Sequence, residues 1–174
     1  MKTIISILLL TFMTQNNWIK NIDTLIQDID LNGYKTRYTE KREDDSIISY
    51  SKFKLNRNYK TVLITEDNNG WFFECKVYQT KNEVVAVFDF SNLPCYYKGY
   101  SAKSRPISEI SETKSYFKND SIGIEYRRYI DVFKNQNIDS LKIELLKKPF
   151  NSKLLGKVDY KKEMTKFKRM RKFN

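Results

Sequence analysis

The chain of 174 residues contains no histidine, and this absence narrows the chemistry open to it. Histidine is the usual general base of serine and cysteine hydrolases and the commonest protein ligand of transition metals. Two cysteines, Cys75 and Cys95, cannot by themselves complete a four-ligand zinc site. With only five glycines, the chain also lacks a glycine-rich phosphate-binding loop. We therefore expect neither a metal nor a nucleotide cofactor.

Long apolar runs are equally scarce, and only one stretch suits an export signal. The run IISILLLTFM, about ten residues behind Lys2, has the length of a signal-peptide core and falls short of the ~20 residues that span a membrane. We predict a signal peptide over residues 1–14, cleaved between Thr14 and Gln15, although the usual small-residue pattern is missing. The alternative is a buried first helix or strand. Cleavage would deliver an exported chain, periplasmic or secreted, without a transmembrane helix.

Glycine and proline are too few to indicate a linker, since the chain has five of one and three of the other. A hydrophobic content of 40%, with twelve Tyr and eleven Phe, excludes a disordered chain. The abundance of Lys, Asn and Ile is typical of an AT-rich bacterial genome. We predict a single α+β domain over residues 15–146, followed by a basic tail over 147–174.

The predicted fold is an N-terminal amphipathic helix packed on an antiparallel meander of four to six strands, with a helical basic C-terminal region. Asn16 or Asn17 is the candidate cap of the first helix, and Asn32-Gly33 offers a left-handed stop. The apolar side of this helix repeats at helical spacing, through Ile19, Ile22, Ile26 and Ile29. The charged stretch 34–45 favours a loop or an irregular edge.

The stretch NNGWFFECKVYQTKNEVVAVFDF predicts strands joined by two-residue loops at Asn69-Gly70 and Lys81-Asn82. Both loops lead to one shared apolar face. The expected opposite pairs are Ile64 with Cys75, Val62 with Val77, Val77 with Ala86, Cys75 with Phe88, and Phe73 with Phe90. Phe53 and Leu55 are expected to extend this face into a strand over 46–55, with its turn at 56–58.

The segment 115–133 is open to two interpretations. Ile122, Ile124 and Tyr126 alternate as a strand does, with Asn119-Asp120 as a hairpin loop. The same segment also carries an apolar stripe at helical spacing. Gly123 and the β-branched residues favour the hairpin. A short helix over 139–148 is expected to end before the proline at 149.

Carboxylates are the remaining groups for catalysis. The expected register places Glu74 opposite Asp89 on the outer face, and a pair of like charges costs stability unless it is compensated. Such a pair can serve as an acid/base or cation site. The alternative, which we favour, is a solvated pair relieved by Lys76 and nearby lysines. We therefore assign no catalytic residue.

Cys75 and Cys95 are a candidate disulfide if the chain is exported, because oxidising compartments favour pairing. Closing a loop of about twenty residues contributes roughly 3 kcal/mol. The alternative, which we favour, is that Cys75 is a small buried hydrophobe. The spacing does not match a redox-active pair.

The basic charge belongs to the tail, where eleven Lys or Arg residues stand against Asp159 and Glu163. A helix from Val158 collects apolar residues on one side, namely Tyr160, Met164, Phe167 and Met170, and basic residues on the other. Such a helix can lie on an anionic surface through Lys161, Lys162, Lys166, Lys168, Arg169 and Lys172. The alternative, which we favour, is that the stripe docks on the domain and the lysines face solvent.

These observations favour a small exported protein that binds a partner without catalysis and uses a basic surface. An anionic membrane surface or an acidic protein would suit that surface, while export removes nucleic acid as a partner. Two alternatives remain: an enzyme that uses Glu74 and Asp89, and an immunity-type inhibitor of an acidic protein. The sequence carries no diagnostic motif of a known family.

Overall fold

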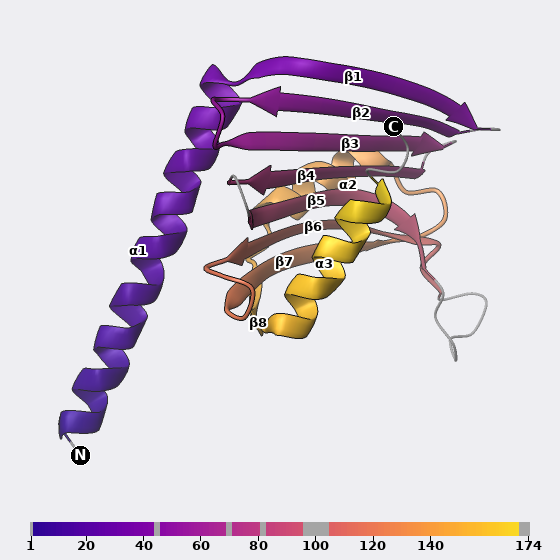
Figure 1. Cartoon of the computed structure of the whole chain (residues 1–174). Helices are drawn as coiled ribbons and strands as arrows, with labels where there is room; N and C mark the ends of the chain where they lie inside the picture. The colour runs from indigo at the N-terminus through magenta and orange to yellow at the C-terminus, as the bar shows by residue number, and fades with distance from the viewer. Residues whose placement is uncertain (1, 44–45, 69–70, 81–82, 96–104, 171–174) are drawn as a thin grey trace.

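The computed structural model describes residues 2–43, 46–68, 71–80, 83–95 and 105–170, with the side chains of 2–16, 43, 68 and 166–170 outside the description. Within these ranges the chain forms one antiparallel sheet whose eight strands follow each other in chain order (Figure 1). The strands are β1 Tyr34–Glu43, β2 Ser46–Lys54, β3 Lys60–Asn68, β4 Trp71–Gln79, β5 Val84–Pro94, β6 Ser108–Phe117, β7 Gly123–Val132 and β8 Asn151–Leu155. The helices are α1 Lys2–Asn32, α2 Ile138–Lys147 and α3 Lys157–Met170.

The predicted fold class, a helix packed on a meander of four to six strands, is wrong. The sheet has eight strands and dominates the chain. The prediction missed β1 and β8, which are the two edge strands. Their side chains are mostly exposed on both faces, so they lack the apolar alternation by which a half-buried strand is recognised in a sequence.

Helix α1 is continuous from Lys2 to Asn32, so the expected cap at Asn16 or Asn17 does not form. It ends where predicted, and the amide of Gly33 donates to the carbonyl of Ile29 at 2.8 Å. The left-handed stop is wrong, because the backbone angle φ of Gly33 lies outside the left-handed region. Glycine is needed there for another reason: a Cβ atom would lie 2.3 Å from the Ile29 oxygen.

The two faces of the sheet carry different helices. Helix α3 covers one face, called here the α3 face, while α2 and the C-terminal turns of α1 lie on the other, called the groove face (Figure 1). The α3 face holds a core that includes Tyr50, Val62, Ile64, Cys75, Val77, Val87, Phe117 and Leu155. On the groove face, Ile26 and Ile29 of α1 pack on Tyr78, Ala86 and Tyr116. Helix α2 packs through Leu141 and Leu145 on Ile110, Ile130 and Val132.

The hairpin of β3 and β4 has the predicted register, with Ile64 opposite Cys75 and Val62 opposite Val77. The neighbouring strand β2 was assigned to the wrong face. Tyr50, opposite Ile64, joins the α3 face, whereas Phe53 lies opposite Thr61 and Leu55 packs with the α1 cluster. The turn at 56–58 is confirmed by the Asn56 side chain, which accepts from the amides of Asn58 and Tyr59.

The register between β4 and β5 is shifted by one residue from the prediction. Val77 lies opposite Val87, Cys75 opposite Asp89 and Phe73 opposite Ser91, so the expected partners Ala86, Phe88 and Phe90 are wrong. The amide of Thr80 donates to Glu83 at 2.9 Å, which agrees with a two-residue connection, although residues 69–70 and 81–82 lie outside the described part. The shift comes from a bulge, because Gln79 pairs with Val84 and Tyr78 with Ala86.

The ambiguous segment 115–133 belongs to a hairpin of β6 and β7. The loop covers residues 118–122, so the expected two-residue loop at Asn119-Asp120 is wrong. Asn119 shapes this loop by accepting from the amides of Ser121 and Ile122 at 2.9 and 2.8 Å. Gly123 is required where β7 begins, since a Cβ atom would lie 2.6 Å from the Tyr116 oxygen. Helix α2 ends before residue 149 as expected, and Asn137 caps its start by accepting from Ser140.

The segment expected as a basic tail supplies structure to the sheet. Strand β8 pairs with β7, and Leu155 at its end is 7% exposed. Helix α3 forms over the predicted residues, with Tyr160 and Met164 packed against the core of the α3 face. The Tyr160 ring lies 5.2 Å from that of Phe117, edge to face.

Candidate functional site

Three neighbouring strands place similar residues side by side on the groove face. Each row crosses β4, β5 and β6 in that order, and β5 supplies its centre. The rows are Tyr78, Ala86 and Tyr116; then Lys76, Phe88 and Lys114; then Glu74, Phe90 and Glu112. Successive rows are two residues apart, roughly 7 Å along the strands. The face therefore has an aromatic centre line flanked by a pair of lysines and a pair of glutamates.

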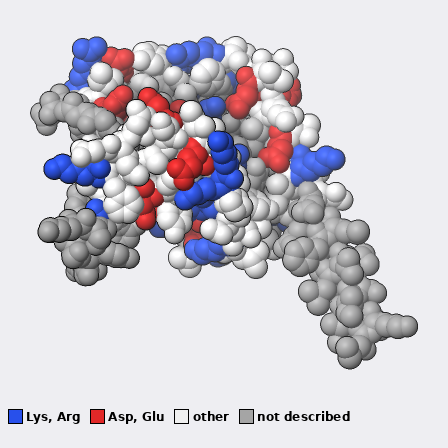
Figure 2. All heavy atoms as spheres, turned by 180° about the vertical axis from the view of Figure 1, so that it is seen from behind, with Lys and Arg blue, Asp and Glu red and all other residues white. Residues whose placement is uncertain are grey.

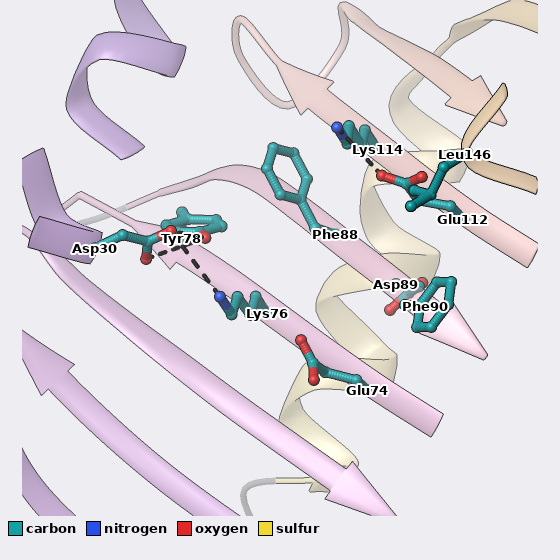
Figure 3. Close-up of a pocket in the computed structure, with 10 residues that line it drawn as sticks. All are labelled: Asp30, Glu74, Lys76, Tyr78, Phe88, Asp89, Phe90, Glu112, Lys114 and Leu146. Atoms are coloured by element: carbon teal, nitrogen blue, oxygen red, sulfur yellow. Dashed lines mark hydrogen bonds and ion pairs between the residues drawn. The ribbon is translucent and has the colours of Figure 1, made fainter. Parts of the chain in front are cut away.

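A groove of about 410 Å³ opens over these rows, between the last turns of α1 and α2 (Figure 3). Asp30 of α1 lies at one end, and Leu146 of α2, whose side chain is 62% exposed, lies near the other. Phe88 and Phe90 line the groove between them. Figure 2 shows the molecule from this side, with acidic and basic groups next to one another rather than gathered into areas of one sign.

Two tyrosine hydroxyls fasten α1 to the sheet beside the groove. Tyr78 donates to Asp30 at 3.0 Å, and Tyr116 donates to Asp23 at 2.8 Å. Phe88 stands between them, with ring centroids 5.3 Å from Tyr78 and 5.4 Å from Tyr116 in edge contacts. Burial raises the pKa of both tyrosines, and the neighbouring aspartates raise it further. Both hydroxyls therefore remain protonated and act as donors.

Arg128 holds the α2 side of the groove. Its guanidinium donates through two nitrogens to Glu112, with 2.7 Å from Nε to Oε2, and through Nη1 to the carbonyl of Leu146 at 2.7 Å. The side chains of Arg128 and Glu112 are 11% and 16% exposed. The Phe150 ring covers the guanidinium at 4.4 Å. One arginine thus joins the C-terminal end of α2 to β6, where positive charge also suits the helix dipole.

The other charges in the groove are unequally paired. The Nζ atom of Lys114 lies 3.2 Å from Oε1 of Glu112, and the Nζ atom of Lys76 lies 4.0 Å from Oδ2 of Asp30. Glu74 is half-buried and makes no hydrogen bond or ion pair with the described residues. Among the carboxylates on this face of the groove, Glu74 is therefore the one that makes no ion pair with the described part of the chain.

The predicted pair of Glu74 and Asp89 is not formed. Glu74 lies opposite Phe90, and Asp89 lies opposite Cys75. Neighbouring residues of a strand point to opposite faces, so the Asp89 side chain belongs to the α3 face and that of Glu74 to the groove. The bulge in β5 causes this separation, because it shifts Asp89 by one position relative to β4.

The candidate disulfide is absent: Cys75 and Cys95 both lie in described parts of the chain and are not joined. Cys75 is fully buried in the middle of β4, opposite Asp89. Cys95 follows the end of β5 and therefore stands six residues beyond that position, roughly 20 Å along the strand. A disulfide needs Cα atoms less than about 7 Å apart.

The predicted anionic-surface residues lie on or beyond α3. Lys161 and Lys162 are exposed, on the helix whose Tyr160 and Met164 face the core. Lys166, Lys168 and Arg169 lie on the same helix with side chains outside the description, and Lys172 lies outside the described residues. In the described turns of α3, the apolar stripe therefore docks on the sheet, which is the alternative that the sequence favoured.

Sequence reasoning missed most of the groove. Phe88, Glu112, Lys114 and Arg128 were not recognised, because their common face depends on the register of β5 and β6. A signal for the α1 contacts was present, since Asp23 and Asp30 are seven residues apart and share one helix face. Within the described residues, no group of three or more acidic or cysteine side chains is arranged to hold a metal ion.

Comparison with known proteins finds no match, whether among protein-family models, curated proteins or solved structures. In the described part of the chain, no helix combines the length and the apolar character needed to cross a membrane.

Proposed function

We propose that this chain is a non-enzymatic binding protein and that the groove between α1 and α2 is its ligand site. The observation that carries the proposal is that Phe88 and Phe90, successive residues on the groove face of β5, line an open hollow of about 410 Å³ between two helices. A largely apolar hollow of a few hundred Å³ with a few polar groups is the usual form of a ligand pocket.

The groove supports binding better than catalysis. General acid/base catalysis by carboxylates needs two groups whose environments differ and which both reach the substrate. Here Glu112 is held by Arg128 and Lys114, and Asp30 is held by Tyr78. Asp89 lies on the other face. Every other carboxylate that lines the groove from this face is already bound to a neighbour, so Glu74 has no second carboxylate with which to act.

A steric variant tests the groove directly. Leu146→Trp adds bulk at the edge of the groove, and Ile143→Trp adds the same bulk on α2, where the side chain is 59% exposed and does not line the groove. We expect small fragments to shift the amide resonances of Phe88 and Phe90 in the native chain and in Ile143→Trp, and to lose affinity at least about tenfold in Leu146→Trp. Equal affinities in both variants would contradict the proposal.

A second candidate function uses the outer side of α3. Lys157, Lys161 and Lys162 are exposed there, and the chain has a net charge of +11. We propose that this side contacts an anionic membrane surface or an acidic protein through charge alone, because Tyr160 and Met164 are already packed on the sheet. Such contact weakens as salt rises, since the Debye length is about 8 Å at physiological ionic strength.

The α3 proposal is tested with vesicles that contain anionic lipid. Charge reversal of Lys161 and Lys162 to Glu should abolish binding at low salt. The matched control reverses Lys20 of α1 and Lys134, which are exposed and do not belong to α3. Equal loss in both variants would indicate attraction by net charge and would exclude a surface built on α3.

Export remains part of the proposal. Expression of the full chain in a bacterial host, followed by N-terminal sequencing, should give a product that begins near Gln15 and is found outside the cytoplasm. Trp18, Ile19 and Ile22, which pack on the sheet, all follow that cut and would remain. A cytoplasmic product that retains Met1 would contradict export.

A further inference from the structure

Glu74 lies in an environment that suits a bound positive charge. Glu74 is half-buried and lines the groove, and its carboxylate has no hydrogen-bond or ion-pair partner among the described residues. Partial burial makes an uncompensated carboxylate costly, and a cationic partner relieves that cost. The groove thus offers one site at which a ligand can supply a missing interaction.

The basic side chains of the groove are already engaged. Lys114 lies 3.2 Å from Glu112 and places its ammonium over the rings of Phe88 and Phe150, at 5.7 and 5.3 Å. Lys76 lies 4.0 Å from Asp30. An anionic ligand would have to compete with these carboxylates for the lysines, whereas a cation meets Glu74 without displacing any described contact.

Aromatic rings lie next to Glu74. Phe90 is its direct cross-strand partner, and the Phe72 ring lies 5.3 Å from that of Phe90. An ammonium group bound by Glu74 would lie near the Phe90 ring, where cation–π attraction adds to the ion pair. Phe72 already takes a cation on its ring, since Lys142 of α2 lies 4.7 Å from its centroid.

We propose that the groove binds a small organic ammonium ion with an aromatic or branched aliphatic body. Its ammonium would pair with Glu74, and its apolar body would lie on Phe88 and Phe90, towards Leu146. The volume of about 410 Å³ suits a compact molecule. This inference rests on the proposed function of the groove and names the class of its ligand.

Three probes of similar shape test the charge of the ligand on the full chain: phenethylammonium, 2-phenylethanol and phenylacetate. Amide resonances of Glu74, Phe88, Phe90 and Lys114 report binding by NMR titration. We expect phenethylammonium to bind at least about tenfold more tightly than phenylacetate, with the neutral alcohol between them, because a hydrogen bond to a charged group adds affinity of that order.

Glu74→Gln keeps the shape of the side chain and removes its charge. We expect it to weaken phenethylammonium binding about tenfold or more and to leave the alcohol unchanged. Glu144→Gln, an exposed position on α2, removes the same charge from the protein and should leave both probes unaffected. Phe90→Leu, which keeps an apolar side chain, should weaken the ammonium probe about threefold or more through loss of the cation–π contact.

The outcomes separate the two proposals. If groove amides respond but phenylacetate binds as well as phenethylammonium, or Glu74→Gln and Phe90→Leu bind normally, the ammonium class is wrong and the groove remains a binding site. If no probe of any charge shifts the groove amides, the proposed function of the groove fails as well.

Discussion

The hydroxyl of Tyr78 donates a hydrogen bond to Asp30, with 3.0 Å between the oxygens, and so joins β4 to the last turn of α1. The Tyr78 side chain is 1% exposed, and Asp30 lines the groove. The same bond therefore positions one end of the candidate site and supports the core beneath α1.

Removing this bond should destabilise the fold modestly. Tyr78→Phe keeps the ring and deletes the donor, and we expect a loss of about 1 kcal/mol in the free energy of unfolding. Asp30 is 42% exposed and keeps Lys76 nearby, so water can replace part of the bond. Urea unfolding measures the change. Tyr38→Phe, which removes an exposed bond to Glu40, is the control and should change stability by less than about 0.5 kcal/mol. Equal losses would contradict a special role for the Tyr78 bond.

The raised pKa values of Tyr78 and Tyr116 predict a loss of stability at high pH. Each tyrosine keeps its proton in the folded chain above the ordinary value of 10.0, while the unfolded chain releases it. The folded state then binds more protons than the unfolded state, so stability is complete below about pH 10 and falls as pH rises further. The free energy of unfolding at about pH 8 and about pH 11 should fall more in the native chain than in Tyr78→Phe/Tyr116→Phe. Equal losses would place the titrating groups elsewhere.

Arg128 should contribute more to the stability of the fold than its neighbour Arg127. Arg128→Ala leaves Glu112 and the carbonyl of Leu146 without this donor. We expect the free energy of unfolding to fall by about 3 kcal/mol. This is the lower end of the range for breaking a buried ion pair, because Lys114 still pairs with Glu112. Arg127→Ala removes a pair with Glu109 whose arginine is 46% exposed, and it should cost about 1 kcal/mol or less. Chemical unfolding of both variants tests the order, and a reversed order would contradict it.

The bulge in β5 predicts that one residue of the sheet can be removed. Deletion of Val85 leaves Val84 opposite Gln79 and Ala86 opposite Tyr78, so the residues that follow keep their partners and faces. The half-buried side chain is lost at a cost of about 1 kcal/mol, and the chain should still unfold cooperatively. Deletion of Thr113 in β6, which pairs without a bulge, should abolish the fold because it reverses the faces that follow. Equal damage from both deletions, seen by circular dichroism, would argue against the bulge.

Helix α3 should act as part of the folded domain. Tyr160→Ala removes an edge contact with Phe117 and a 3.4 Å hydrogen bond from the amide of Val84, and we expect a loss of about 2 kcal/mol in unfolding experiments. Val158→Ala on the same helix, where the side chain is 80% exposed, should change stability by less than about 0.5 kcal/mol. Truncation after Leu146, which removes β8 and α3, should leave no cooperative unfolding transition. A fully stable truncated chain would show that residues 147–174 are a separate tail.

Parts of the fold that obey a simple rule could be predicted from the sequence. The hairpin of β3 and β4 is predicted from alternation on one apolar face and from the turn-forming sequence pair Asn69-Gly70, and its register is correct. The sequence favours the hairpin of β6 and β7 over a helix, because Asn119-Asp120 suits a hairpin loop and Gly123 and the β-branched residues disfavour a helix. Helices α2 and α3 were recognised from a proline stop and from an amphipathic stripe.

The errors have a common physical origin in register. In the run VVAVF, which begins at Val84, apolar residues occupy both faces, so the side-chain pattern cannot reveal a bulge. That one residue moved Asp89 away from Glu74 and brought Phe88 between Lys76 and Lys114. The groove itself needs contacts between α1, β4 to β6 and α2, and no local pattern in the chain specifies such an arrangement.

A crystal structure of the chain soaked with phenethylammonium tests the central claim most directly. We expect the ligand between α1 and α2, with its nitrogen about 3 Å from a carboxylate oxygen of Glu74 and its ring on Phe88 or Phe90. An empty groove at a concentration that saturates binding in solution, or a ligand seated only on α3, would contradict the assignment of the groove as the ligand site.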